Sequence, residues 1–246
     1  MKRLLAVDIG NSWVHLALFV DGRVKKRFRF ATDSIDYFSQ LKKISSRVFC
    51  DELLVASVVP GALSKFLASG QRIFRKKIKV VGKDMPVPLV NRYRYPNKLG
   101  IDRLLNAYAT LRLYGAPAII IDYGTAVTFD ILSKKKEFLG GLILPGLNVS
   151  LNSLNQNTSF LPKIRLSLPK EFIGRDTQQC ILSGVVNGMV LLTNALVTIL
   201  KEKIGNQATV VATGGDASII KKSSQVIDVL DKDLTLKAIC LLSQSL

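Results

Sequence analysis

Apolar segments with strand-like patterns open the chain and recur near its middle, each time as a set of three. The first set covers residues 4–8, 14–20 and 23–30, and Asp21-Gly22 is a strong two-residue hairpin signal before its third member. Apolar positions with helical spacing follow at residues 34–46 and 62–74, and strand-like runs cover residues 52–59 and 77–81. The first half therefore has the predicted order β-β-β-α-β-α-β.

The second half repeats this order, and its first aspartate, Asp122, lies 114 residues after Asp8. Its predicted strands cover residues 119–122, 127–132, 137–144, 209–212 and 226–230, and a turn and helix begin at Pro145. Such an order is typical of a ribonuclease H-like sheet with helices on its faces. We therefore expect an α/β fold of two duplicated ribonuclease H-like domains, residues 1–113 and 114–246, which face each other across a cleft.

A helical segment is inserted into the second repeat at about residues 159–205. Its apolar stripe has helical spacing and consists of Ile181, Val185, Met189, Leu192, Leu196 and Ile199. Asn187 and Asn194 interrupt the apolar pattern of this segment. The sequence therefore predicts a packing or subunit-contact helix and not a membrane span.

Each half contains an aspartate, a spacer and a glycine directly after its first strand, in "DIGNS" and in "DYGTA". Glycine lets backbone N–H groups approach an anion, and Asn11, Ser12 and Thr125 add short polar donors. The aspartates would hold magnesium or another cation that neutralises phosphate, on the floor of a nucleotide cleft. The alternative is that Asp8 and Asp122 only cap turns, but the matching strand–turn–strand contexts favour the nucleotide site.

A third aspartate lies in "LGIDRLLNAYATL", at the start of a predicted helix with an apolar face of Leu104, Tyr108 and Leu111. Phosphoryl transfer to an alcohol needs a carboxylate that accepts the hydroxyl proton, and Asp102 is the best candidate. Arg103 beside it would orient an anionic or amide-rich acceptor. The alternative role for Asp102 is a favourable charge at the N-terminus of the helix.

Composition narrows the class of protein. The 246 residues are 48% hydrophobic, which is enough to bury a proper core, and no run reaches the roughly 18 apolar residues that span a bilayer. Asp8 interrupts the first apolar run before a signal peptide could form. The three cysteines are far apart and lack metal-type spacing, so we expect free thiols in a reducing cytoplasm and no membrane partner.

The net charge of +17 raises nucleic acid as a partner. The basic residues form short clusters, in "RVKKRFRF", "RIFRKKIK" and "KKK", without a recognisable nucleic-acid-binding motif. Phe28 and Phe30 fit a core face better than a base-stacking platform. We therefore expect a solvated basic surface that helps attract anionic substrates, and no nucleic-acid partner.

The motifs taken together resemble those of a known family. They are "DIGNS", "YRYPNKLGIDR", "IDYGTAVTFD", "GGLILPG", "GRDT" with "SGV", and "TGGDA", in this order from end to end of the chain. The sequence resembles type III pantothenate kinases of the actin, heat-shock ATPase and sugar kinase superfamily. The resemblance implies ATP-dependent phosphorylation of pantothenate towards coenzyme A, with Mg²⁺ accompanying ATP. It also implies a homodimer that requires a monovalent cation, K⁺ or NH₄⁺.

The resemblance also implies roles for individual residues. The ATP-binding set is Asp8, Ile9, Gly10, Asn11, Ser12, Trp13, Val14, His15 and Thr125. The pantothenate-binding set is Tyr93, Gly100, Ile101, Asp102, Arg103 and Thr177, with Asp102 as the proton acceptor and Thr177 near the dimer interface. Asp122 matches the ligand of the monovalent cation. Ser12 stands where the family usually has threonine, and it keeps the hydroxyl group.

Some residues of the loops have a plainer interpretation. His15, the only histidine, follows the first loop in a strand, where a structural or solvent-facing role is expected. Trp13 is expected to pack and not to stack on adenine, and Gly214-Gly215 could either approach the nucleotide or form a tight turn.

Three other functions compete with a pantothenate kinase. A kinase of another small alcohol, such as a sugar, would share the nucleotide loops and differ only in the acceptor segment. A ribonuclease H-like nuclease would need several carboxylates converging on two metals, and would leave the glycine loops unexplained. A non-catalytic regulator would not need the complete set of Asp8, Asp102, Asp122 and Thr125.

Overall fold

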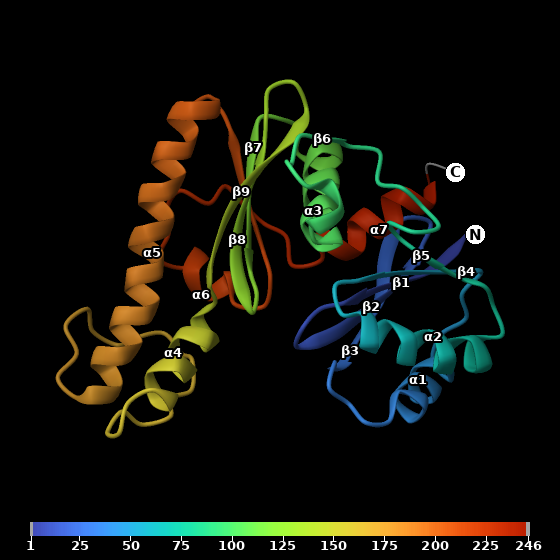
Figure 1. Ribbon diagram of the computed structural model, residues 1–246, viewed down its shortest axis with the longest axis horizontal. Helices are drawn as coiled ribbons and strands as arrows, with labels where there is room; N and C mark the ends of the chain where they lie inside the picture. Colours follow the sequence, from blue (N-terminus) through green and yellow to red (C-terminus); the bar gives the residue numbers. More distant parts are fainter. Residues whose placement is uncertain (1, 245–246) are drawn as a thin grey trace. The chain divides into compact units, whose positions relative to one another are not determined.

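The computed structural model describes residues 2–244, and the chain forms two compact units (Figure 1). The first unit comprises Met1–Leu89, Tyr95–Ala109 and Asp233–Leu246. The second comprises Val90–Arg94 and Thr110–Lys232. Each unit thus contains segments from both halves of the chain, because the C-terminal helix packs against the N-terminal sheet.

The sheet of the first unit has the strand order β3-β2-β1-β4-β5. Its central strand β1 (Arg3–Ile9) pairs antiparallel with β2 (Trp13–Val20) and parallel with β4 (Glu52–Ser57). The outer strands are β3 (Arg23–Ala31) and β5 (Ile78–Val80). Four consecutive apolar residues of β1 are buried, as expected for a central strand covered on both faces.

Helices cover both faces of this sheet. Helix α1 (Tyr37–Ser45) begins at Asp36, whose carboxylate accepts the N–H of Ser39, and it packs beside α2 (Pro60–Phe74). Both helices bury apolar side chains against Leu5, Val7 and Ile9 of β1. Helix α7 (Leu234–Gln244) packs against β1, β2 and β4, and α3 (Ile101–Leu113) follows the short 3₁₀ turn Pro96–Lys98.

The sheet of the second unit has the order β11-β10-β7-β8-β9-β6. Its central strand β7 (Ala118–Tyr123) pairs antiparallel with β8 (Ala126–Leu132) and parallel with β10 (Thr209–Thr213). The remaining strands are β9 (Glu137–Pro145), β11 (Val229–Leu230) and β6 (Val90–Asn91). Apart from β6, this order repeats that of the first unit, so the duplicated ribonuclease H-like fold is confirmed.

The helices of the second unit are α4 (Leu147–Gln156), α5 (Thr177–Ile204) and α6 (Ala217–Lys221). In Figure 1 the long helix α5 runs alongside the sheet, and Val186, Met189 and Val197 pack into the core with strands β7, β8 and β10. The predicted helical insertion therefore contains one long helix, preceded by an irregular segment at residues 157–176.

The buried face of α5 differs from the predicted stripe. Met189 is buried as expected, but Leu192 and Ile199 are exposed, and the other buried positions are Leu182, Ser183, Val186, Val190, Thr193 and Val197. The physical reason is that α5 is apolar around most of its circumference, so spacing alone could not identify the face that meets the sheet. By length and composition, α5 is also the one described helix that could span a bilayer, a test that core helices of soluble proteins also pass.

Candidate active site

The first predicted loop lies at the carboxyl end of β1 and is held by backbone contacts on two sides. The N–H of Gly10 donates to the carbonyl of Trp13 (3.0 Å), which closes the turn. Thr32, just after β3, donates its hydroxyl to the carbonyl of Gly10 (2.8 Å) and its N–H to the carbonyl of Ser12 (3.0 Å). The loop therefore has a fixed backbone, while the side chains of Asn11 and Ser12 are exposed.

Asp8 lies at the same edge of the sheet. It is only partly buried, while Ile9 is buried in the core under α1 and α2. Successive residues of a strand point to opposite faces, so Asp8 lies on the face away from that core. The last but one position of β1 is therefore where a carboxylate can sit without entering the apolar core.

The predicted acceptor segment, residues 100–103, lies near this edge of the sheet, because Gly100 is close to Val58 and Val58 contacts Ile9. The N–H of Val58 donates to the carbonyl of Ile9 (3.2 Å), directly before the loop. A Cβ atom at Gly100 would lie 3.8 Å from the side chain of Val58. The structure thus brings the start of α3 and the first loop to the carboxyl ends of β1 and β4, where open α/β sheets bind ligands.

Asp102 lies in the first turn of α3 and folds back on the helix terminus. Its Oδ1 accepts the N–H of Arg103 (2.8 Å). Burial raises the pKa of Asp102, an effect that the N–H and the charge of Arg103 oppose. A carboxylate with a raised pKa is a stronger base than an exposed one, so the electrostatics suit a proton acceptor.

Gly100 leaves the space that this carboxylate occupies. A Cβ atom at position 100 would lie 2.5 Å from Oδ1 of Asp102. Any other residue at position 100 would therefore push the carboxylate out of its place. Ile101 is partly buried and Arg103 is buried, so the residues on both sides of Asp102 pack into the protein.

In the second unit, Asp122 occupies the position in β7 that Asp8 has in β1. It is partly buried and is followed by a buried residue, Tyr123, as Asp8 is by Ile9. Gly214, with a φ of +94°, packs directly over it, since a Cβ atom there would lie 2.5 Å from Oδ1 of Asp122. The Gly214-Gly215 turn predicted after β10 therefore makes a close backbone approach to Asp122 itself.

Asp216 also lies at this edge of the sheet and is not among the site residues predicted from the sequence. Its N–H donates to the carbonyl of Tyr123 (3.1 Å), and its carboxylate accepts the amide of Asn148 (3.0 Å). Burial raises the pKa of Asp216. The motif "TGGDA" at the end of a predicted strand contains this aspartate and is the sequence signal for it.

The second loop lies between β7 and β8, and Thr125 is exposed on it. In this loop the N–H of Gly124 donates to the carbonyl of Ala126 (3.1 Å), and the N–H of Gly146 donates to the carbonyl of Thr125 (3.0 Å). This loop is thus closed and supported in the same manner as the first one.

Trp13 and His15 lie on β2 after the first loop. Trp13 is exposed and the guanidinium of Arg29 stacks over its ring, 4.8 Å from the centroid. Burial and the nearby Arg29 lower the pKa of His15, so it is mostly neutral at pH 7. Trp13 is therefore a surface residue in contact with a cation and not part of the core.

Tyr93 and Thr177 belong to other parts of the second unit. Tyr93 follows β6, and its ring lies 6.3 Å from that of Phe138 and next to Gly140. Thr177 is the exposed first residue of α5, directly after the N-cap Asp176, whose carboxylate accepts the N–H of Gln179 (2.8 Å).

Metal binding at either edge would depend on few protein ligands. Within residues 2–244, no three histidine, cysteine or acidic side chains come together as a metal cluster. A carboxylate with backbone carbonyls nearby, as at Asp122, suits a hard cation that takes its other ligands from water and phosphate. The donor set thus fits a cation bound together with a nucleotide.

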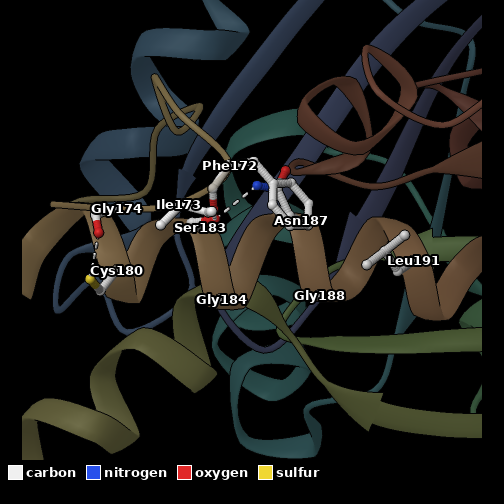
Figure 2. A pocket seen from close by; sticks show the side chains of 9 residues that line it. All are labelled: Phe172, Ile173, Gly174, Cys180, Ser183, Gly184, Asn187, Gly188 and Leu191. Carbon is white, nitrogen blue, oxygen red and sulfur yellow. Dashed lines mark hydrogen bonds between the residues drawn. The ribbon is translucent and has the colours of Figure 1, made fainter.

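The outward face of α5 is unusually free of charge. A surface hollow of about 460 Å³ lies along it. Figure 2 shows the residues that line it, with Gly184 and Gly188 on the helix and Phe172 and Ile173 at the side. Leu191 continues this face and is 57% exposed. Asn187 donates to the hydroxyl of Ser183 (2.9 Å), so the polar groups of the hollow are satisfied locally.

Comparison with known proteins identifies the family of the chain. The sequence profile of the type III pantothenate kinase family matches residues 4–198. A type III pantothenate kinase from Bacillus cytotoxicus is 33% identical over 97% of this chain and 95% of its own length.

Two solved structures share the fold. A protein from Campylobacter jejuni, described as a Baf family transcriptional activator, has a TM-score of 0.63 at 21% identity over 98% of both chains. The activator of 2-hydroxyisocaproyl-CoA dehydratase from Clostridium difficile, with bound ADPNP, has a TM-score of 0.55 at 13% identity, over 99% of this chain and 97% of its own.

Proposed function

The chain belongs to the type III pantothenate kinase family, which phosphorylates pantothenate with ATP in coenzyme A biosynthesis, and we propose which of its residues carry out this reaction. The observation that carries the proposal is the position of Asp102. Its partly buried carboxylate lies at the same sheet edge as the first loop, and burial raises its pKa.

ATP is proposed to bind to residues 8–15 and to Thr125. The turn geometry of both loops supports this role, because short loops with glycine let N–H groups and hydroxyls approach phosphate oxygens. Mg²⁺ accompanies ATP and neutralises the charge of the phosphates. Asp8 is proposed to orient the water shell of that ion.

Asp102 is proposed to be the catalytic base. It accepts the proton of the acceptor hydroxyl while that oxygen forms a bond to the γ-phosphorus and the bond to ADP breaks. The N–H of Arg103 holds Oδ1 of Asp102, which leaves Oδ2 for the proton. The space left by Gly100 lets the carboxylate keep this orientation.

Pantothenate is proposed to contact Gly100, Ile101, Asp102 and Arg103, together with Tyr93 and Thr177. The packing of Tyr93 against Phe138 would hold its ring in place for such a contact. A monovalent cation, K⁺ or NH₄⁺, is proposed to bind Asp122, where Gly214 leaves the carboxylate accessible to backbone carbonyls.

A homodimer is proposed to form through the outward face of α5. Its exposed small and apolar residues recur at helical spacing, namely Gly184, Gly188, Leu191, Ala195 and Ile199. No charged residue lies between Thr177 and Leu200 in a chain of net charge +17. Such an uncharged stripe suits a second copy of the same helix, since two glycines allow close approach and charge repulsion is absent. Thr177 begins this helix and would lie near the contact.

The basic charge is proposed to be a general surface property. Some of the cations stack on aromatic rings or pair with carboxylates, as Arg27 does with Asp233 (2.6 Å) and Arg72 does over Phe38. These contacts hold the basic side chains at the protein surface. We propose neither a nucleic-acid partner nor a membrane partner, and we place the enzyme in the cytoplasm.

A coupled assay tests the proposal. Purified protein is supplied with ATP, Mg²⁺ and either pantothenate or a panel of sugars, in potassium and in sodium buffer. We expect ADP formation with pantothenate only, and more of it in potassium. Turnover of a sugar in place of pantothenate would contradict the assignment of the acceptor segment.

A further inference from the structure

Thr32 makes the contacts that hold the first loop in place, although it lies 22 residues away from Gly10. Its side chain is 6% exposed. Its hydroxyl donates to the carbonyl of Gly10 and its N–H to the carbonyl of Ser12, at ordinary hydrogen-bond distances. One residue therefore fixes two peptide groups of a four-residue turn.

Thr32 is itself anchored in the core. Its carbonyl accepts the hydroxyl of Tyr37 (2.9 Å). Tyr37 is 2% exposed, and its ring packs edge-on against Phe30 with centroids 5.0 Å apart. A series of contacts therefore links the core under α1 to the first loop.

Because the peptide bond is planar, the hydrogen bond from Thr32 to the carbonyl of Gly10 also fixes the direction of a backbone N–H group of the loop. The carbonyl of Gly10 and the N–H of Asn11 belong to one planar trans peptide and point in opposite directions. Because the carbonyl points to Thr32, the N–H of Asn11 points away from it. The same holds for the carbonyl of Ser12 and the N–H of Trp13.

Comparison with the second loop shows which of the two contacts made by Thr32 occurs only at the first loop. After β9, Gly146 donates its N–H to the carbonyl of Thr125, as Thr32 does to Ser12 after β3. A side chain at Gly146 would collide with the loop, since a Cβ atom there would lie 2.3 Å from the carbonyl oxygen of Gly124. The duplicated fold thus keeps the backbone contact in both halves and adds the hydroxyl contact only in the first.

We propose that Thr32 is a positioning residue for ATP, because its hydroxyl fixes the peptide between Gly10 and Asn11 so that the N–H of Asn11 faces the phosphates. This inference rests on the proposed ATP-binding role of residues 8–15. Thr32 does not touch the nucleotide and acts through the loop.

The substitution Thr32→Val removes the hydroxyl and keeps the shape and the backbone N–H. Loss of one such hydrogen bond corresponds to a change of about 2- to 10-fold in an equilibrium constant. We expect this loss in the affinity for ADP by calorimetry and a similar rise in KM for ATP. The KM for pantothenate should stay within about 2-fold, since the hydrogen bonds of Thr32 go to Gly10, Ser12 and Tyr37 and not to residues 100–103.

Two further variants test whether the hydroxyl contact of Thr32 itself causes the loss. Thr32→Ser keeps the hydroxyl and should restore nucleotide affinity to near that of the unchanged protein. Thr110→Val is a matched control, because Thr110 is fully buried and its hydroxyl has no hydrogen-bond partner among the described residues. It should leave the affinity for ADP unchanged.

The inference is overturned if Thr32→Val binds ADP as tightly as the unchanged protein, or if Thr32→Ser loses as much affinity as Thr32→Val. A similar loss in Thr110→Val would also overturn it, since the effect would then not come from the hydrogen bond that Thr32 donates. The ADP titration does not depend on the acceptor. A failure of pantothenate phosphorylation in the unchanged protein would therefore count against the proposed function and leave the test of Thr32 intact.

Discussion

The substitution Asp102→Asn should separate catalysis from stability in this protein. Asparagine has nearly the size of aspartate, and its Oδ1 can still accept the N–H of Arg103 that lies 2.8 Å from Oδ1 in the structure. The space left by Gly100 is unchanged. The variant therefore keeps the geometry of the first turn of α3 and loses only the carboxylate proposed to accept the proton.

The expected loss in turnover follows from the role of a general base. Such groups contribute about 10²- to 10⁴-fold, so the barrier should rise by about 3 to 5 kcal/mol and kcat should fall accordingly. Affinity for ADP should change little, because the backbone of the first loop is held by Thr32 and not by Asp102.

The free energy of unfolding of Asp102→Asn should not fall with its turnover and should stay the same or rise. Burial raises the pKa of Asp102, so its folded-state pKa lies above the unfolded value. The stability linked to this group is present below the unfolded pKa and is lost as pH rises through the folded pKa. At pH 7 to 8 the charged carboxylate therefore opposes folding, and Asp102→Asn should be as stable as the unchanged protein or more so.

Three measurements on one preparation test this reasoning. They are single-turnover phosphorylation of pantothenate, titration with ADP, and urea unfolding at pH 5 and pH 8. Asp33→Asn, at an exposed position, serves as the control and should be neutral in all three. Near-normal turnover of Asp102→Asn would show that Asp102 only stabilises its helix, and an equal loss of ADP affinity would place it at the nucleotide.

Four further outcomes are expected. Gly100→Ala should lower kcat by about 10-fold or more with a small effect on ADP affinity, because a Cβ atom would displace Oδ1 of Asp102; unchanged kcat would refute this role of the glycine. Asp122→Asn should abolish the difference in activity between potassium and sodium buffers, and a retained potassium effect in this variant would move the cation elsewhere. Leu191→Arg should convert a dimer to a monomer in analytical ultracentrifugation, whereas Ile35→Arg, at an equally apolar exposed site, should not. Double-stranded DNA should bind weakly and dissociate steeply as salt rises, and tight sequence-selective binding at physiological salt would contradict a purely solvated basic surface.

Much of the fold could be predicted because most strands of the two sheets leave a local pattern, whereas the two-residue strand β6 (Val90–Asn91) was not predicted. The central strands β1 and β7 are continuous apolar runs, and the hairpin between β2 and β3 has its turn residues in place. The same local patterns located Asp8, Asp122 and Asp102, since each lies at the end of a strand or the start of a helix.

Other features depend on contacts between distant segments and leave no local pattern. Helix α7 was not predicted, and its place in the first unit depends on packing against β1 from the other end of the chain. The hydroxyl of Thr235 on α7 donates to Asn106 on α3 (2.7 Å), a pairing across 129 residues. The role of Thr32 and the proximity of Gly214 to Asp122 are visible only once the strands are paired.

The two carboxylates with the most specific proposed roles share one structural device. Asp102 and Asp122 each lie against a glycine, Gly100 and Gly214, at which a Cβ atom would come within 2.5 Å of a carboxylate oxygen. At Gly214 the positive φ already favours glycine, but the backbone of Gly100 does not have a positive φ. At position 100, glycine is therefore required by the space that the carboxylate of Asp102 occupies and not by the backbone conformation. A glycine two residues before a catalytic carboxylate then belongs to the same functional unit as the carboxylate, and a substitution there should affect turnover before it affects folding.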